Sequence, residues 1–94
     1  MASDKTLEQQ FEEAAVNIKK LKAKPSDNEL LDLYKYYKQA TVGDNHEAAP
    51  GMFELKKKAK HNAWKSQAGK SKEECQKAYV DLANELIGKL GLSE

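Results

Sequence analysis

The amino-acid sequence predicts an all-α protein, a single domain over residues 1–94 built as a four-helix bundle. Apolar residues recur at the 3.6-residue spacing of amphipathic helices in four segments. No segment alternates apolar and polar residues as a half-buried strand does. Turn-forming Gly and Pro residues collect between the segments, which makes each segment a separate helix.

The first two helices are expected at residues 6–22 and 27–42. In the first helix, the apolar residues on one face are Leu7, Phe11, Ala14, Ala15, Ile18 and Leu21. Pro25 ends this helix because proline has no backbone N–H. Ser26 and Glu29 have the spacing of a capping box, so the second helix begins there.

The last two helices are expected at residues 55–67 and 71–90. Ser71 and Glu74 form a second capping box at the start of the last helix. Cys75 lies on the apolar face of that helix, and we assign it to the core.

Residues 43–54 form the longest connection and contain most of the turn-forming residues. We expect Met52, Phe53 and Leu55, within or just after this loop, to pack back onto the core. A connection of this length also allows the helices to depart from a plain up-down order.

The composition excludes several classes of protein. A single cysteine rules out a disulfide framework, and it cannot complete a Cys/His zinc site with only two histidines. No apolar run reaches the roughly 20 residues that span a bilayer, and the N-terminal residues lack the apolar stretch of a signal peptide. We therefore expect a soluble, cytoplasmic protein.

All 16 basic residues are lysine, and the net charge is +1. The near-neutral charge and the absence of arginine argue against a nucleic-acid partner. No residues form a recognisable catalytic group, because Cys75 is expected in the core, His46 lies in a loop and His61 lies on a lysine-rich helix. We expect a binding protein with no enzymatic activity, metal or cofactor.

The second helix carries the most informative pattern. Tyr34, Tyr37 and Lys38 share one stripe at i, i+3 and i+4, and Leu30 and Leu31 continue it one turn earlier. One interpretation is a helix at the edge of the core whose tyrosines reach towards water. The other is a platform where phenol rings stack on an aromatic base and hydroxyl and ammonium groups donate to phosphate.

Several residues on the other helices extend this pattern. Lys19, Lys56 and Lys60 lie beside the apolar edges of their helices and can supply charge to the same cavity. Trp64 is expected in the core. Tyr79 faces inward, and its hydroxyl needs either a core backbone partner or a ligand phosphate.

Several motifs together resemble the acyl-CoA-binding protein family over nearly the whole chain. They are YKQATVGD at 37–44, KPSD at 24–27, PGM at 50–52, KAKHNAW at 58–64 and SKEE with KAY at 71–79. The resemblance implies a skewed up-down-down-up bundle. It also implies a monomeric, non-enzymatic carrier that buffers medium- to long-chain acyl-CoA esters and delivers them to enzymes and membranes.

The resemblance also implies roles for individual residues. Lys38 is expected to pair with the ribose 3′-phosphate, and the segment from Tyr34 to Lys38 is expected to bind the nucleotide. The full set of implied ligand-binding residues is Lys19, Leu30, Leu31, Tyr34, Lys35, Tyr36, Tyr37, Lys38, Lys56, Lys60 and Tyr79. Lys35, Tyr36, His61 and Ala49 depart from the family pattern.

Three other functions remain open from the residues alone. The first is a protein-interaction module whose apolar groove docks an amphipathic helix. The second is a nucleic-acid binder that uses the lysine-rich residues 55–72. The third is an acyl-CoA hydrolase or transferase, for which the sequence offers no nucleophile.

Overall fold

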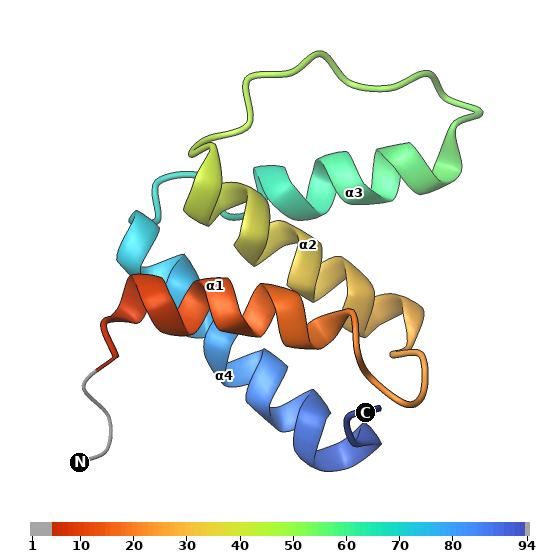
Figure 1. Cartoon of the computed structure of the whole chain (residues 1–94). Helices are drawn as coiled ribbons and strands as arrows, with labels where there is room; N and C mark the ends of the chain where they lie inside the picture. Colours follow the sequence, from red (N-terminus) through yellow and green to blue (C-terminus); the bar gives the residue numbers. More distant parts are fainter. Residues whose placement is uncertain (1–4, 94) are drawn as a thin grey trace.

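The computed structural model describes residues 5–93 and confirms an all-α, four-helix architecture (Figure 1). The helices are α1 (Leu7–Ile18), α2 (Asp27–Thr41), α3 (Leu55–Lys65) and α4 (Lys72–Leu90). In Figure 1, α1 and α4 run in one direction and α2 and α3 in the other, so the order is up-down-down-up. The long connection after α2 returns the chain to the starting end, which lets α3 run parallel to α2.

Capping boxes fix the start of three helices. The boxes are Thr6 with Gln9, Ser26 with Glu29 and Ser71 with Glu74. The second and third boxes are the ones that the sequence predicts. In each box the serine or threonine side chain accepts from a backbone N–H, and the partner side chain accepts from the cap residue's own N–H.

The expected extension of the first helix to Lys22 is wrong, because α1 ends at Ile18. The residues after it are drawn into a short antiparallel backbone pairing with the C-terminal segment. The Lys22 N–H donates to the Gly91 carbonyl at 2.9 Å, and the Ser93 N–H donates to the Lys20 carbonyl at 2.6 Å. The other helix boundaries lie within two residues of expectation.

The core lies where α4 packs against both α1 and α2. Its fully buried residues include Cys75, Ala83 and Leu86, which confirms the core position predicted for Cys75. Phe11, Tyr37 and Tyr79 join three helices through their rings, with centroid separations of 5.1 to 5.8 Å. Such aromatic contacts add about 0.5–1.5 kcal/mol each beyond area burial.

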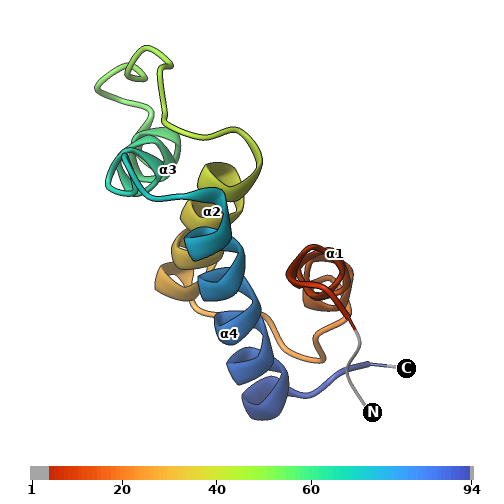
Figure 2. The same ribbon diagram turned by 90° about the vertical axis from the view of Figure 1, so that its left-hand side faces the viewer.

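The helices do not form a closed bundle. Within residues 5–93, the backbone of α3 approaches only that of α2, and the backbone of α1 approaches only that of α4. The α1 and α2 helices meet through side chains, where the Phe11 ring stacks on the Tyr37 ring. Figure 2 shows the result, with α3 and α1 on opposite sides of the α2–α4 pair. Residues of α1 and α2, together with Tyr79 of α4, line a groove between these helices.

The first half of the α2–α3 connection is tied to α3. The Trp64 indole N–H donates to the Gly43 carbonyl at 2.8 Å, and the Asn45 side chain donates to the His61 carbonyl at 3.2 Å. The His61 ring nitrogen Nε2 lies 3.1 Å from the Glu47 carbonyl oxygen. These contacts hold residues 43–47 against the helix.

The second half of the connection does not pack onto the core, so that expectation is wrong. Met52, Phe53 and Leu55 are 71%, 90% and 73% exposed. The physical reason is the position of α3, which packs against α2 alone among the described helices and leaves no core surface beside its N-terminal end. None of the helices described is long and apolar enough to cross a bilayer.

Two glycines of the last helix predict opposite effects of the same substitution. Gly91 has φ 78° and ψ 158°, a region that is essentially restricted to glycine, whereas Gly88 lies within α4 and has open space where an alanine methyl group would stand. We expect Gly91→Ala to destabilise the fold by about 1–3 kcal/mol. Gly88→Ala, the matched control, should stabilise it by about 0.5–1 kcal/mol. Urea denaturation of both variants checks the signs, and equal signs contradict the structure.

Candidate functional site

A groove between α1 and α2, with α4 as its floor, forms a pocket of about 360 Å³. We call it the aromatic pocket. Its lining residues are Ala15, Ile18, Lys19, Leu30, Leu33, Tyr34, Tyr37 and Tyr79. The aromatic pocket therefore combines phenol rings, one ammonium group and an apolar wall, which suits a flat ring system that carries charged substituents.

The tyrosines of this pocket differ in their burial. Tyr37 is 40% exposed at the rim, whereas Tyr79 is only 5% exposed at the floor. Burial raises the pKa of Tyr79 to about 12, and the pKa of Tyr34 is also raised, first by burial and then by the Glu47 charge. The hydroxyls of Tyr34 and Tyr79 are therefore protonated at neutral pH and can donate hydrogen bonds.

A second pocket, of about 450 Å³, lies between the N-terminal half of α2 and α3. We call it the apolar pocket. Its lining residues are Lys24, Asp27, Leu30, Leu31, Leu55, Lys56, Ala59 and Lys60. Leu30 lines both pockets, so the aromatic and apolar pockets adjoin at this side chain.

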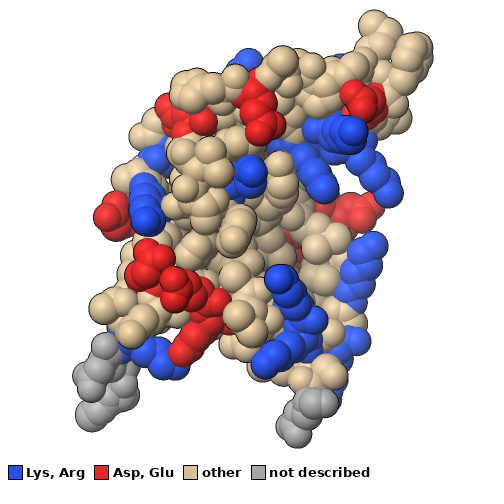
Figure 3. Space-filling model, turned by 45° about the horizontal axis from the view of Figure 1, so that its top comes forward, with Lys and Arg blue, Asp and Glu red and all other residues tan. Residues whose placement is uncertain are grey.

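Four of the predicted lysines keep their charge available. Among the described residues, Lys19, Lys38, Lys56 and Lys60 form no salt bridge. Two of them lie over aromatic rings instead: Lys60 Nζ is 5.4 Å from the Tyr34 ring centroid, and Lys38 Nζ is 4.7 Å from that of Trp64. Figure 3 draws the face of the molecule seen when the top of Figure 1 is turned forward, and lysine side chains gather along its right-hand side.

Three predicted site residues, Lys35, Tyr36 and Lys38, line neither pocket. The Lys35 ammonium pairs with Asp32 at 3.1 Å, and Tyr36 lines a different pocket with residues of α4. Each helical residue turns about 100° from the last, so Tyr36, two positions after Tyr34, lies about 200° around the helix and faces away from it. The structure places Trp64 in the interior, as expected, with 2% of its surface exposed.

The sequence analysis missed several lining residues of the two pockets. The missed residues are Ala15, Ile18, Lys24, Asp27, Leu33, Leu55 and Ala59. The signal for some was present, because Leu55 and Ala59 form an i, i+4 apolar edge on an otherwise lysine-rich helix. Which elements face that edge depends on the packing of α3, which the sequence pattern does not specify.

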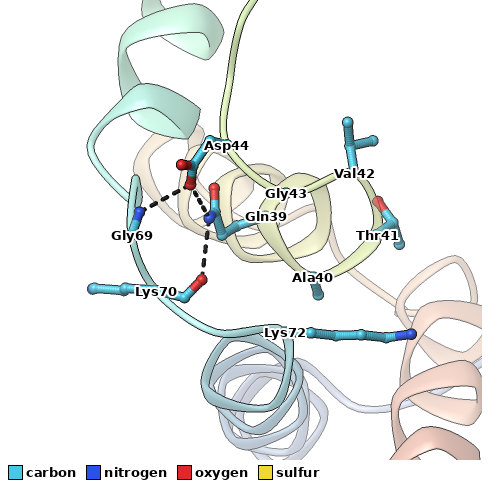
Figure 4. Close-up of a pocket in the computed structure, with 9 residues that line it drawn as sticks. All are labelled: Gln39, Ala40, Thr41, Val42, Gly43, Asp44, Gly69, Lys70 and Lys72. Carbon is cyan, nitrogen blue, oxygen red and sulfur yellow. Dashed lines mark hydrogen bonds between the residues drawn. The ribbon is translucent and has the colours of Figure 1, made fainter.

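A third pocket, near the C-terminal end of α2, is a structural junction (Figure 4). The Asp44 carboxylate accepts from the Gln39 side chain at 2.8 Å and from the Gly69 N–H at 2.9 Å. The Gln39 amide also donates to the Lys70 carbonyl at 3.2 Å. The hydrogen bonds from Gly69 and Gln39 lower the pKa of Asp44. These bonds connect the loop after α2 to the turn before α4.

The buried Tyr79 predicts a distinct step in an alkaline titration. Its folded-state pKa of about 12 lies above the ordinary tyrosine value of 10.0. The stability that this difference contributes is fully present below pH 10 and is lost as the pH rises towards 12. Absorbance titration of tyrosine ionisation should show a late step that Tyr79→Phe removes. Loss of an early step instead contradicts the burial of this hydroxyl.

Comparison with known proteins identifies relatives of this chain. A family model described as "Acyl CoA binding protein" matches residues 8–83. An acyl-CoA-binding protein homolog 1 of Caenorhabditis elegans is 54% identical over 81 residues, which cover 86% of this chain and 94% of the nematode protein. An acyl-CoA-binding protein homolog of Manduca sexta is 51% identical over 88 residues, covering 93% and 98% of the two chains.

A solved structure is similar to this chain both in fold and in sequence. The crystal structure of Oryza sativa acyl-CoA-binding protein 2 superposes with a TM-score of 0.85 at 42% identity, covering 88% of this chain and 90% of the rice chain. The family match spans most of the chain, and both relatives are matched over nearly their full length. The chain therefore belongs to the acyl-CoA-binding protein family, whose members are non-enzymatic binding proteins.

Proposed function

We propose that this protein binds medium- to long-chain acyl-CoA esters and carries them as a monomer in the cytosol without breaking a bond. The observation that carries the proposal is the adjacency of two pockets, one lined by tyrosine rings and the other by aliphatic side chains with lysines beside them. The aromatic pocket has phenol rings and an ammonium group, the apolar pocket has aliphatic walls, and Leu30 belongs to both. An acyl-CoA ester has the same two-part character, a charged nucleotide joined to a hydrocarbon chain.

The aromatic pocket supports binding of the nucleotide part. Tyr34 and Tyr37 offer rings for the adenine and hydroxyl donors for phosphate oxygens. Lys19 lines the same pocket and Lys38 lies one turn further along α2, both without a carboxylate partner in the described chain. Following the family resemblance, we assign Lys38 to the ribose 3′-phosphate; its ammonium lies over the Trp64 ring and forms no salt bridge among the described residues.

The apolar pocket supports binding of the acyl chain. Leu30, Leu31, Leu55 and Ala59 form its aliphatic surface, and Lys56 and Lys60 line the same pocket and can donate to phosphate oxygens. Burial of hydrocarbon contributes about 0.8 kcal/mol per methylene. Association itself costs on the order of 4–15 kcal/mol, so the acyl chain and the nucleotide must both contribute.

This arrangement suits a carrier. Both pockets open to the surface between neighbouring helices, so a ligand can enter and leave without unfolding the bundle. Acyl-CoA-using enzymes and membranes are the expected transient partners that receive the cargo. Lys35, whose ammonium pairs with Asp32, and Tyr36, which lines a different pocket with residues of α4, have no role in this proposal.

Two lysines of one helix provide a matched test of the phosphate assignment. A charge-assisted hydrogen bond contributes about 1.5–3 kcal/mol, so Lys38→Gln should weaken palmitoyl-CoA binding about tenfold or more. Lys35→Gln should change the affinity less than twofold, because the Lys35 ammonium is engaged by Asp32. Titration calorimetry gives both constants.

The same titration with dephospho-CoA esters separates the phosphate from the rest of the nucleotide. The loss caused by Lys38→Gln should disappear when the ligand has no 3′-phosphate. An equal loss of affinity for both ligands contradicts the assignment of Lys38. Failure of the wild-type protein to bind any acyl-CoA contradicts the proposed function.

The apolar pocket predicts how affinity depends on acyl length. Each added methylene should strengthen binding about fourfold until the pocket is full, because each contributes about 0.8 kcal/mol. Leu31→Ser places a hydroxyl in the pocket wall and should flatten this dependence while leaving the affinity for CoA itself unchanged. A competition series of acyl-CoA esters measures both slopes. A variant slope equal to the wild-type slope contradicts the assignment of this wall to the chain.

A further inference from the structure

The turn before α3 presents a pair of apolar side chains to solvent. Phe53 is 90% exposed and Met52 is 71% exposed, and Leu55 follows at 73%. We call these three residues the apolar tip. They follow one another in the sequence, with only Glu54 between Phe53 and Leu55. Single exposed apolar residues are common, but three large ones at one turn are typical of an interaction site.

The turn that carries the tip is held by its own hydrogen bonds. The Glu54 N–H donates to the Gly51 carbonyl at 3.0 Å, and the Gly51 N–H donates to the Glu54 carboxylate at 2.9 Å. The other carboxylate oxygen of Glu54 pairs with Lys57 at 3.2 Å. Met52 and Phe53 therefore project from a closed turn, and their exposure follows from its geometry.

Lysines lie on the C-terminal side of the tip. Lys56, Lys57 and Lys58 follow it directly at the start of α3, and the first turn of that helix contains no acidic residue. Positive charge at this end opposes the helix dipole, so these lysines do not stabilise the helix. Lys56 and Lys58 also form no salt bridge within the described residues. Their position makes sense if they meet an anionic partner.

We infer that the apolar tip and the lysines beside it dock this protein on an anionic lipid bilayer. Met52 and Phe53 insert at the interface between headgroups and acyl chains, while the lysine stems lie along it and their ammonium groups contact anionic headgroups. A convex tip of a few residues suits a soft, deformable surface.

The observations favour a bilayer over a protein partner. The tip lies at an extremity of the molecule, where the connection reaches the start of α3 (Figures 1 and 2). A stable protein interface needs about 800 Å² per partner, which calls for a broad face. A second copy of this chain would bring lysines against lysines.

The position of the tip gives the docking a purpose, which rests on the proposed carrier function. Leu55 and Lys56 belong both to this region and to the lining of the apolar pocket. Docking through Met52 and Phe53 therefore brings the mouth of the apolar pocket to the bilayer surface. An acyl chain can then pass between lipid and pocket with little exposure to water.

Vesicle sedimentation with the ligand-free protein tests the docking separately from acyl-CoA binding. Wild-type protein should bind vesicles of phosphatidylcholine with phosphatidylserine and should bind pure phosphatidylcholine vesicles much more weakly. High salt should reduce the binding. Phe53→Gln should weaken it about tenfold or more, and Lys58→Gln about fivefold.

Val42→Gln is the matched control, because Val42 is also an exposed apolar side chain, at 61%, but lies at the far end of α2. It should bind vesicles as the wild type does. Phe53→Gln should keep the wild-type affinity for palmitoyl-CoA in solution, so loss of vesicle binding and loss of cargo binding are distinguishable.

The inference is overturned if the wild type does not bind anionic vesicles or binds both vesicle types equally. It is also overturned if Phe53→Gln binds vesicles as the wild type does, or if Val42→Gln loses as much vesicle binding as Phe53→Gln. Sedimentation of the wild type as a dimer that Phe53→Gln dissociates also overturns it, in favour of self-association. If vesicles bind but acyl-CoA does not, the docking stands and the carrier function fails.

Discussion

The contact of α4 with both α1 and α2 is the constraint on which the rest of the structure depends. Phe11, Tyr37 and Tyr79, one from each helix, meet at this junction with ring centroids less than 6 Å apart. Because α4 is the shared support, the backbones of α1 and α2 stay apart and the two helices meet only through side chains, which leaves a groove between them. Tyr79 belongs both to the core and to the lining of the aromatic pocket, so stability and ligand recognition share this residue.

The second half of the site depends on α3, which is attached to the rest of the protein in a different way. Among the described helices α3 packs on α2 alone, and its connections are fixed by polar contacts. Trp64 binds the Gly43 carbonyl, and Asp44 joins Gln39 to Gly69. This helix contributes one wall of the apolar pocket and most of its lysines. A small chain thus builds two adjoining pockets by splaying helices apart instead of enclosing a cavity.

Local signals in the sequence were sufficient for the helices and for much of the site. The two serine capping boxes and the stripe of Tyr34 and Tyr37 depend on spacing within one helix, which a sequence displays directly. The premature end of α1 could not be predicted this way, because it results from backbone pairing with residues about seventy positions later. The exposure of Phe53 could not be predicted either, since apolarity alone does not reveal whether a neighbouring surface exists to cover it.

The backbone pairing between residues 20–22 and 91–93 is short, but it affects a wall of the binding site. It fastens the C-terminal end of α1, one wall of the aromatic pocket, to the end of α4 through two backbone hydrogen bonds at the molecular surface. Trimming of the carboxyl end by a peptidase would therefore loosen that wall without removing any residue that lines the pocket. Ligand lifetime would then respond to the length of the tail, a property of the polypeptide that leaves the binding chemistry untouched.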